Sequence, residues 1–403
     1  MSDYIDEIET QYNEFPYPEP ILNMPQLIEQ GYQQGSCLKL IWQRLFPEKE
    51  FSDNLSVLIA GCGTNQAVYH ALKYPRSQHY AIDVSQASLN HVKNMIKKYN
   101  ITNLTVEKKD ILELKEKNKF DYVVSTGVIH HTQNPQENLK RLVEATKDDG
   151  ALFIMVYASY LRTGVYFLQD AFKYLGLKSN KEGIQIAEKL IQLSPKNHYA
   201  HNYLNVIKSS GDSSRDLTFD AGIVDTFFNA RDVSYNVFEL KNLIESSGAY
   251  FQNWYDNMFY YRKLFDFRSV EKLNETYMNL DHWELSDFTQ KMNPNSGKFN
   301  FILRKNKKYK NRFFKIEELL PSTFVHKLNE GDFRKKNNSS EDAVSFDAEG
   351  IIWMNINNKI ENILNKSNKL IAEKKPESQL SFGDLQKILH NYWKNGYIAL
   401  SDK

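Results

Sequence analysis

The stretch Val57-Leu58-Ile59-Ala60-Gly61-Cys62-Gly63-Thr64-Asn65 decides the fold of this chain. Four apolar residues run into a loop with two glycines, and a helical pattern begins at Gln66. Glycines allow a sharp backbone turn and let a ligand approach without a Cβ atom in the way. The free amides at the start of the following helix can receive an anionic group. The stretch therefore predicts a strand, a ligand-binding turn and a helix.

The alternation of strand-like and helix-like segments continues as far as residue 157. The segments lie at 56–60, 66–73, 80–83, 85–99, 104–108, 120–125, 135–146 and 151–157. Strands that alternate with helices of this length predict βαβ units, hence an α/β fold with a Rossmann-like sheet covered by helices on both faces. Right-handed crossovers place the loops after the strands at one edge, where such folds bind ligands.

Three further signals stand at strand ends in this region. Asp83, followed by Val84, lies about 20 residues after the glycine loop, where an acid accepts the hydroxyls of a ribose. Asp110-Ile111 follows the third strand, and an acid beside an apolar side chain suits an adenine. The fourth strand ends in Ser125-Thr126-Gly127-Val128-Ile129-His130-His131.

A dinucleotide-binding loop would begin in the same way. It needs a third glycine near Gln66 or Ala67, so that the helix packs closely on the strand around a pyrophosphate, and that glycine is missing. A nicotinamide-dependent oxidoreductase therefore remains an alternative that leaves Asp110-Ile111 unexplained.

These four ordered signals make residues 55–157 resemble the class I S-adenosylmethionine-dependent methyltransferases. The resemblance implies that the glycine loop holds the methionine part of the cofactor, that Asp83 binds the ribose, that Asp110 and Ile111 hold the adenine, and that the fourth strand end closes the site near the sulfonium. The cofactor-binding residues that it implies are Gly61, Cys62, Gly63, Thr64, Asn65, Asp83, Val84, Asp110, Ile111, Thr126, Gly127 and Val128.

Two positions depart from the family pattern. The family often has an acid where this chain has Ile59, and often a glycine where it has Asn65. Either Asn65 takes over a polar contact to the methionine end, or the cofactor site is weakened or altered. A catalytically degenerate domain that acts as a binding subunit therefore stays open as a further alternative.

The flanking segments resemble a bacterial group that includes tetratricopeptide-linked methyltransferases and protein-lysine methyltransferases of intracellular bacteria. The resemblance rests on the aromatic-proline element at residues 12–18, the glycine loop, the segment 127–131 and the segment 224–235. It implies a substrate-side role for Arg231, Asp232 and Tyr235, whose alternative is a solvated loop or ion pairing. Residues 187–204 also resemble one tetratricopeptide-like helix pair, which we interpret as part of a helical insertion.

His130 is the candidate general base, because a histidine titrates near neutral pH. In phosphoethanolamine methyltransferases a histidine at the matching place pairs with an N-terminal tyrosine, which makes Tyr12 and Tyr17 the candidate partners. The alternatives are a histidine that caps the turn after the strand and an N-terminal arm that simply packs. Prolines fix the direction of that arm and suit a lid.

The composition of the chain limits its partners, its location and its metal content. The net charge of +1 argues against a chain-wide nucleic-acid or membrane surface, and we expect neither partner. Two cysteines, the lack of an apolar run at the N-terminus and the lack of a long apolar segment predict a cytoplasmic protein. The scattered histidines and cysteines show no metal-ligand spacing, so no metal is expected.

At 403 residues the chain is expected to hold more than one domain. We predict a helical arm or lid at 1–50, a methyltransferase domain at 51–305 with a helical insertion at about 158–235, and an α+β accessory module at 313–403. In the last part we expect a strand at 350–355, helices at 358–373 and 382–394, and a strand-like segment at 397–400. The basic run at 304–312 is interpreted as a solvated linker, and the polar stretch 335–342 is predicted to be a loop.

The predicted function is transfer of a methyl group from S-adenosylmethionine to a nitrogen, oxygen or sulfur nucleophile. The acceptor is a protein side chain or a small metabolite, and the sequence does not choose between them. The predicted mechanism needs little activation: the nucleophile must lie in line with the S–CH3 bond at about 3–3.5 Å, with water excluded.

Overall fold

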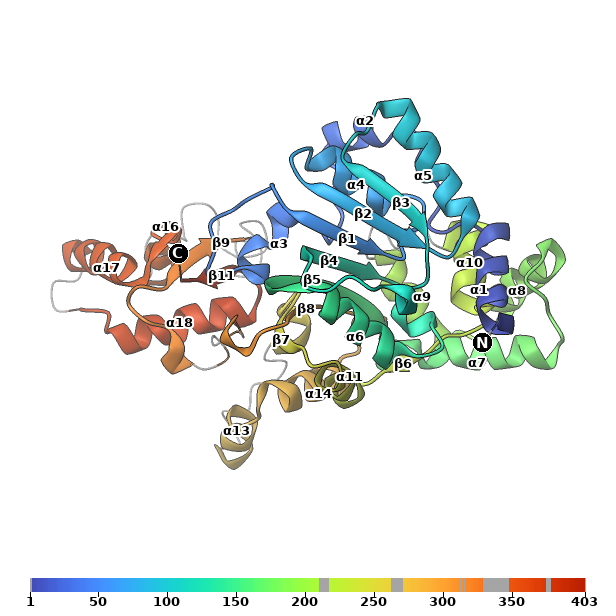
Figure 1. The fold of residues 1–403 in the computed structure, drawn as a ribbon. Helices are drawn as coiled ribbons and strands as arrows, with labels where there is room; N and C mark the ends of the chain where they lie inside the picture. Colours follow the sequence, from blue (N-terminus) through green and yellow to red (C-terminus); the bar gives the residue numbers. More distant parts are fainter. Residues whose placement is uncertain are drawn as a thin grey trace.

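A computed structural model describes residues 2–209, 217–261, 271–309, 311, 314, 316–328, 348–374 and 378–402. Its centre is an eight-stranded sheet with the order β3-β2-β1-β4-β5-β8-β7, in which β6 pairs with β5 (Figure 1). The strands are β1 (Ser56–Ala60), β2 (Gln78–Asp83), β3 (Leu104–Lys108), β4 (Phe120–Thr126), β5 (Thr146–Ala158), β6 (Ser234–Tyr235), β7 (Tyr250–Trp254) and β8 (Lys298–Arg304). The predicted loop at 335–342 lies outside the described residues.

The first half of the sheet is parallel, as predicted. β1 pairs in parallel with β2 and β4, and β2 with β3. Alternate residues of β1 enter two different cores: Leu58 and Ala60 pack on one face, Val57 and Ile59 on the other. Because both faces are buried, the strand has the continuous apolar sequence typical of a parallel sheet.

Helices cover both faces of the sheet. They are α3 (Leu38–Leu45), α4 (Gln66–Lys73), α5 (Gln86–Tyr99), α6 (Pro135–Ala145), α11 (Val237–Ser246), α12 (Met258–Tyr261) and α14 (His282–Met292). α2 (Met24–Glu29) packs on α4, and α13 (Glu271–Met278) projects away from the sheet (Figure 1). Ile59, where the family often has an acid, is fully buried in the strand. The predicted Rossmann-like architecture is confirmed.

The second half of the sheet is antiparallel. β8 runs between β5 and β7 and is antiparallel to both, and its last residue, Arg304, is fully buried. The Arg304 guanidinium donates to Glu48 at 2.7 Å and to the Leu45 carbonyl at 2.6 Å. The start of the basic run at 304–312, interpreted from sequence as a solvated linker, therefore belongs to the core.

The helical insertion separates β5 from β6. It contains α7 (Ser159–Tyr174), α8 (Lys181–Leu193), α9 (Ala200–Ser209) and α10 (Asp220–Phe227), and it has an apolar core of its own. The tetratricopeptide-like segment falls on α8 and the start of α9, but α9 packs mainly against α7 and α8 contacts α10. At the N-terminus, α1 (Ser2–Glu14) lies beside α5 and α10 (Figure 1).

The C-terminal part forms a second, three-stranded antiparallel sheet of β9 (Phe324–Lys327), β10 (Asn358–Lys359) and β11 (Ile398–Ser401). α16 (Ala348–Met354), α17 (Ile360–Lys374) and α18 (Phe382–Lys394) pack around it. The strand expected at 350–355 is wrong, because α16 covers most of it: a short apolar run bounded by polar residues does not by itself distinguish a strand from a buried helix.

The two cysteines, Cys37 and Cys62, are both buried and free. Among the helices of the described residues, none is both long and apolar enough to cross a bilayer.

Candidate functional site

The glycine loop after β1 is fixed by its backbone and by a close neighbour. Gly61 and Gly63 have φ values of +73° and +50°, a region that side chains rarely adopt. A Cβ at Gly61 would overlap the Val128 side chain, which comes from the loop after β4. The two loops therefore touch at the carboxyl edge of the sheet, as the sequence predicts.

Asp83 ties the end of β2 to this loop. Its Oδ2 accepts the Gly63 amide at 2.8 Å and its Oδ1 accepts the Ser85 amide at 2.8 Å. Desolvation raises the pKa of the Asp83 carboxyl, and these two amides oppose the rise. A carboxylate offers about four acceptor positions, so Asp83 can also accept from a ribose hydroxyl. Cys62 beside it is buried, which raises its thiol pKa well above the usual value.

Asp110 and Ile111 follow β3 at the same edge. Asp110 caps the short helix η1 (Ile111–Glu113), and its Oδ1 accepts the Leu112 amide at 2.7 Å. Burial raises the pKa of the Asp110 carboxyl. Ile111 is almost fully enclosed in the core, so it offers an adenine only the edge of its side chain.

Thr126 and Gly127 end β4 opposite the glycine loop. Gly127 has a φ of +75°. The Thr126 hydroxyl accepts the Gln66 amide group at 3.0 Å, and Gln66 is the first residue of α4. This bond joins the two loops through a side chain that no sequence motif singles out.

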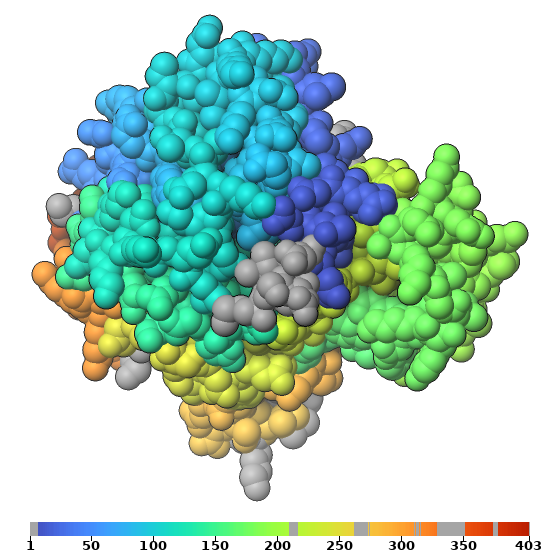
Figure 2. Space-filling view, turned by 45° about the vertical axis from the view of Figure 1, so that its right-hand side comes forward, coloured from blue at the N-terminus to red at the C-terminus, as the bar shows by residue number. Residues whose placement is uncertain are grey.

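The N-terminal arm, residues 12–21, lies across the glycine loop. The Thr64 hydroxyl donates to the Pro18 carbonyl at 2.6 Å. Asn65 binds the arm in both directions, because its Nδ2 donates to the Glu19 carbonyl at 2.8 Å and its Oδ1 accepts the Ile21 amide at 2.9 Å. Figure 2 shows the arm, in dark blue, seated between the cyan half of the sheet and the green insertion.

Asn65 thus has a different environment from the one that the family pattern implies. Its amide group is occupied by the backbone of the arm. The contact to the methionine end of a cofactor stays a prediction, which requires that the arm release this side chain.

Asp225 joins the arm to the sheet and the insertion. Its two oxygens accept the Tyr12 hydroxyl and the Tyr157 hydroxyl, each at 2.8 Å. Asn229 donates to the same carboxylate at 3.4 Å and to the Tyr12 oxygen at 3.2 Å. Burial, and then the Asp225 charge, raises the pKa of both tyrosines well above the usual value, so both hydroxyls stay protonated near neutral pH.

His130 lies beside this group on the short helix η2 (Ile129–His131). It is fully buried, and both of its ring nitrogens lack a hydrogen-bond partner among the described residues. Its ring centroid is 4.0 Å from that of Tyr157 and 4.1 Å from that of His131. Burial, followed by the charges of His131 and Arg162, lowers the His130 pKa well below its usual value, so the ring is neutral.

His130 forms no hydrogen bond with Tyr12 or Tyr17, the candidate partners that the resemblance suggests. Tyr12 donates to Asp225 instead, and Tyr17 stacks on Phe219 with ring centroids 6.4 Å apart. The sequence did not identify Asp225 or Tyr157 as members of the site, because a lone acid on a helix and a tyrosine at a strand end carry no recognisable spacing.

The predicted substrate-side residues differ in their environments. Asp232 forms an almost fully buried ion pair with Arg162, whose guanidinium lies 3.7 Å from the centroid of the Tyr157 ring. The Arg231 carbonyl contacts His131 Nδ1 at 2.6 Å, and Tyr235 is buried where β6 pairs with β5. Asp232 therefore helps to hold the Arg162 guanidinium against the Tyr157 ring. Substrate contact by Arg231 and Tyr235 stays a prediction.

The residues at this edge fit S-adenosylmethionine. Asp83 keeps acceptor positions beside the glycine loop, and the neutral His130 ring has two unused nitrogens at the end of β4. No group of three or more histidine, cysteine or acidic side chains that could hold a metal occurs in the described part of the chain.

Comparisons with known proteins support this assignment. Residues 51–162 match the family described as a methyltransferase domain. An uncharacterised protein of a Synechococcus strain is 24% identical over 256 residues, which span 61% of this chain and 59% of that protein. The (S)-coclaurine N-methyltransferase of Papaver somniferum is 31% identical over 106 residues, which span 26% of this chain and 30% of that enzyme. The matches thus cover less than two thirds of either relative.

PKMT2 from Rickettsia typhi, solved in complex with AdoHcy, shares the fold with a TM-score of 0.62 at 15% identity, over 96% of this chain and 77% of that one. The chain therefore contains a methyltransferase domain. It is of the S-adenosylmethionine-dependent class I type, and S-adenosylmethionine is its cofactor, as predicted from the sequence.

Proposed function

We propose that this protein transfers the methyl group of S-adenosylmethionine to an amine. The observation that carries the proposal is the arrangement of Asp225 at the end of the cofactor edge, where its buried carboxylate lies among aromatic rings. A cationic amine is attracted both by a carboxylate and by the faces of aromatic rings. The rings whose hydroxyls contact this carboxylate belong to Tyr12 and Tyr157, and Tyr17 of the same arm stacks on Phe219 of the insertion.

The cofactor would be held by the loop around Gly61 and Gly63, by Asp83 at the ribose, and by Asp110 with Ile111 at the adenine. Bound there, it supplies an electrophilic methyl group on a sulfonium. The AdoHcy held by PKMT2 supports this placement, because that protein has the same fold.

The residues of this chain position the amine and exclude water. Asp225 attracts the ammonium form, and Tyr12 and Tyr157 keep the carboxylate fixed through their hydroxyls. The ammonium must release one proton to solvent, which exposes the lone pair of the amine. Because the His130 pKa is so low, this ring is a weak base, and its role is to accept a hydrogen bond from the remaining N–H and so orient the nitrogen.

Similarity to an enzyme named as an N-methyltransferase supports a nitrogen acceptor, although the similarity covers 26% of this chain. Whether the amine belongs to a protein or to a metabolite is a separate question. The arm and the insertion meet at Asp225, where Tyr12 donates to the carboxylate, so the acceptor would enter between these two segments.

The test is transfer of label from methyl-labelled S-adenosylmethionine to cell extract, with the products sorted by mass spectrometry into N-, O- and S-methyl compounds. We expect N-methyl products. Asp225→Asn keeps the shape and removes the charge, and should lower kcat/KM by about tenfold or more, mainly through KM. Asp220→Asn, an exposed acid on the same helix, is the matched control.

Labelled O- or S-methyl products alone would contradict the amine proposal and leave methyl transfer intact. Cofactor binding without transfer to any fraction of the extract would contradict both and would identify a binding subunit.

A further inference from the structure

Two nearly buried carboxylates lie close to Tyr157, near the end of β5. Asp225 is 4% exposed, and the side chain of Asp232 is 3% exposed. Removing a carboxylate from water is costly unless hydrogen bonds and a cation compensate for it. The protein compensates the two carboxylates in different ways, and the difference involves Arg162.

Asp232 is neutralised by Arg162, which is 1% exposed and lies near the start of α7. Gln169 donates to the same oxygen of Asp232, Oδ2, at 3.0 Å. The other donors of the guanidinium also contact the helical insertion, where Nε donates to the Tyr166 hydroxyl at 3.3 Å and Nη1 to the Tyr203 hydroxyl at 3.5 Å. Because a guanidinium is planar and its donors lie along its edge, these contacts hold the group in one orientation.

The orientation of Arg162 places its guanidinium carbon 3.7 Å from the centroid of the Tyr157 ring. A cation at this distance is attracted by the π electrons of the ring. The ring also contacts His130, with ring centroids 4.0 Å apart, and the Tyr157 hydroxyl donates to Asp225 at 2.8 Å. Arg162 therefore helps to fix the ring that carries one of the hydrogen bonds to Asp225.

Asp225 has neutral partners instead. Its carboxylate accepts hydrogen bonds from Tyr12, Tyr157 and Asn229, and among the described residues no lysine, arginine or histidine forms an ion pair with it. Buried carboxylates are usually paired with a cation. The charge of Asp225 therefore remains available to a cationic acceptor, because Asp232 rather than Asp225 neutralises Arg162.

We infer that Arg162 is a positioning residue for the methyl acceptor. Held by Asp232, it fixes the Tyr157 ring, and the Tyr157 hydroxyl in turn fixes the Asp225 carboxylate that binds the acceptor amine. Arg162 acts through Tyr157 and does not itself contact the acceptor. Because it concerns an amine acceptor, this role rests on the proposed function.

The test is a mutant cycle between Arg162 and Tyr157 on the full chain. The acceptor is the fraction of cell extract that receives the N-methyl label, and the amount that gives the half-maximal rate at saturating S-adenosylmethionine is the apparent KM. Arg162→Met is combined with Asp232→Asn, because removal of the guanidinium alone would leave a buried carboxylate without its cation. Tyr157→Phe keeps the ring and removes the hydrogen bond to Asp225.

We expect Tyr157→Phe to raise the apparent KM by about tenfold, the usual effect of losing a hydrogen bond to a charged group. The double variant of Arg162 and Asp232 should raise it by about three- to tenfold, with kcat changed by less than about twofold. Combined with Tyr157→Phe, the double variant should change the apparent KM by less than about twofold more, because both act through one hydrogen bond. The affinity for S-adenosylhomocysteine, measured by calorimetry, should be the same in all variants.

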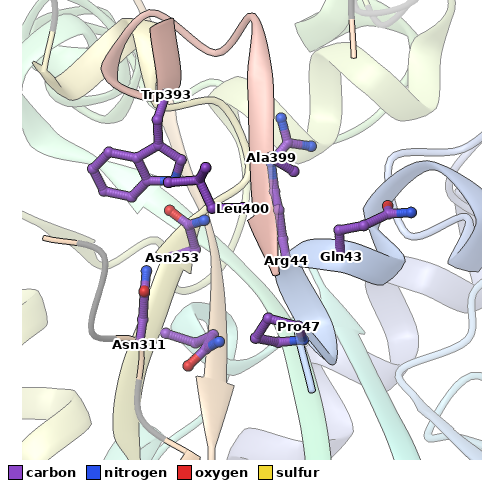
Figure 3. A pocket seen from close by; sticks show the side chains of 9 residues that line it. Gln43, Arg44, Pro47, Asn253, Asn311, Trp393, Ala399 and Leu400 are labelled. Carbon is purple, nitrogen blue, oxygen red and sulfur yellow. The ribbon is translucent and has the colours of Figure 1, made fainter. Parts of the chain in front are cut away.

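Arg44→Met is the matched control. Arg44 is a half-buried arginine on α3 whose guanidinium lies 5.8 Å from the centroid of the Tyr255 ring. Figure 3 shows Arg44 in a recess that Ala399 and Leu400 of β11 also line. In Figure 1, β11 lies at the opposite end of the molecule from α10, which carries Asp225. Arg44→Met should therefore leave the apparent KM unchanged.

If the double variant does not fold, Arg162→Lys replaces it, because an ammonium keeps a charge for Asp232 but cannot reproduce the planar contacts of the guanidinium. It should raise the apparent KM by at least about threefold, and this effect should also vanish in the Tyr157→Phe background. Effects of the Arg162 and Tyr157 substitutions that multiply, or an unchanged apparent KM in the Arg162 variants, would overturn the inference and leave the proposed function intact. Absence of N-methyl products from the wild type would overturn both.

Discussion

At the scale of single residues, Gly61 shows how one position serves both the backbone and the site. Its φ of +73° would strain the backbone of a residue with a side chain, and the absence of a Cβ atom leaves room for Val128. Gly176 has a similar φ of +67°, but a Cβ there would meet nothing within 4 Å, so this position isolates the backbone contribution.

We therefore expect Gly176→Ala to lower the free energy of unfolding by about 1–2 kcal/mol, the usual effect of a left-handed backbone. Gly61→Ala should lower it by clearly more, because overlap with Val128 adds to the same backbone effect. Urea unfolding measures both. Equal effects for the two variants would mean that the loop moves away from Val128 without loss of stability.

Buried histidines make the stability depend on pH. Burial lowers the pKa of His70 to about 3 and that of His79 to about 4. In the unfolded chain they titrate near pH 6.5, at about their ordinary pKa. Below that pH the unfolded state binds more protons, so the free energy of unfolding falls as pH falls, by up to about 1.4 kcal/mol per pH unit for each histidine.

Urea unfolding between pH 7 and pH 5 tests this expectation. The decrease in the free energy of unfolding between these two pH values should be smaller in a His79→Asn variant than in the wild type. It should be unchanged in His198→Gln, which replaces a partly exposed histidine. A free energy of unfolding that is constant across this range would contradict the assignment of neutral buried rings.

At the scale of elements, the N-terminal arm is the segment whose position matters most. Asn65 holds it by two backbone hydrogen bonds, and one of them protects the Ile21 amide. The sequence predicts an arm or lid at this position. Only the structure reveals that Asn65, which departs from the family pattern of the cofactor loop, contacts the arm.

Asn65→Ala should free the Ile21 amide. We expect its hydrogen exchange to accelerate by about tenfold, the equivalent of one hydrogen bond of about 1.4 kcal/mol. The Lys109 amide, which donates to the Asp83 carbonyl at 3.1 Å, is the internal control and should keep its rate. Unchanged protection of Ile21 would mean that other contacts hold the arm.

At the scale of the whole molecule, the sequence predicts the fold of residues 55–157 well. The alternation of strand and helix segments, the glycine loop and the acids at the strand ends all indicate the same Rossmann-like sheet. α17 and α18 were predicted for a similar reason, because their apolar residues recur with a regular helical pattern. β7 and β9 were missed, because strands of only four or five residues leave little periodicity. The Asp225 cluster and the pairing of Arg162 with Asp232 could not be predicted, since both join segments that only the tertiary fold brings together.

The central claim is that the carboxyl edge of β1, β2 and β4 binds S-adenosylmethionine. The direct measurement is titration calorimetry with S-adenosylmethionine and S-adenosylhomocysteine on the wild type, on Asp83→Asn and on Asp53→Asn, an acid outside the proposed site that pairs with Arg76. We predict that both ligands bind the wild type and Asp53→Asn alike. Asp83→Asn should bind more weakly by about 1.5–3 kcal/mol, the contribution of hydrogen bonds to a charged group. A folded protein that binds neither ligand, or an Asp83→Asn variant that binds as the wild type does, would contradict the account.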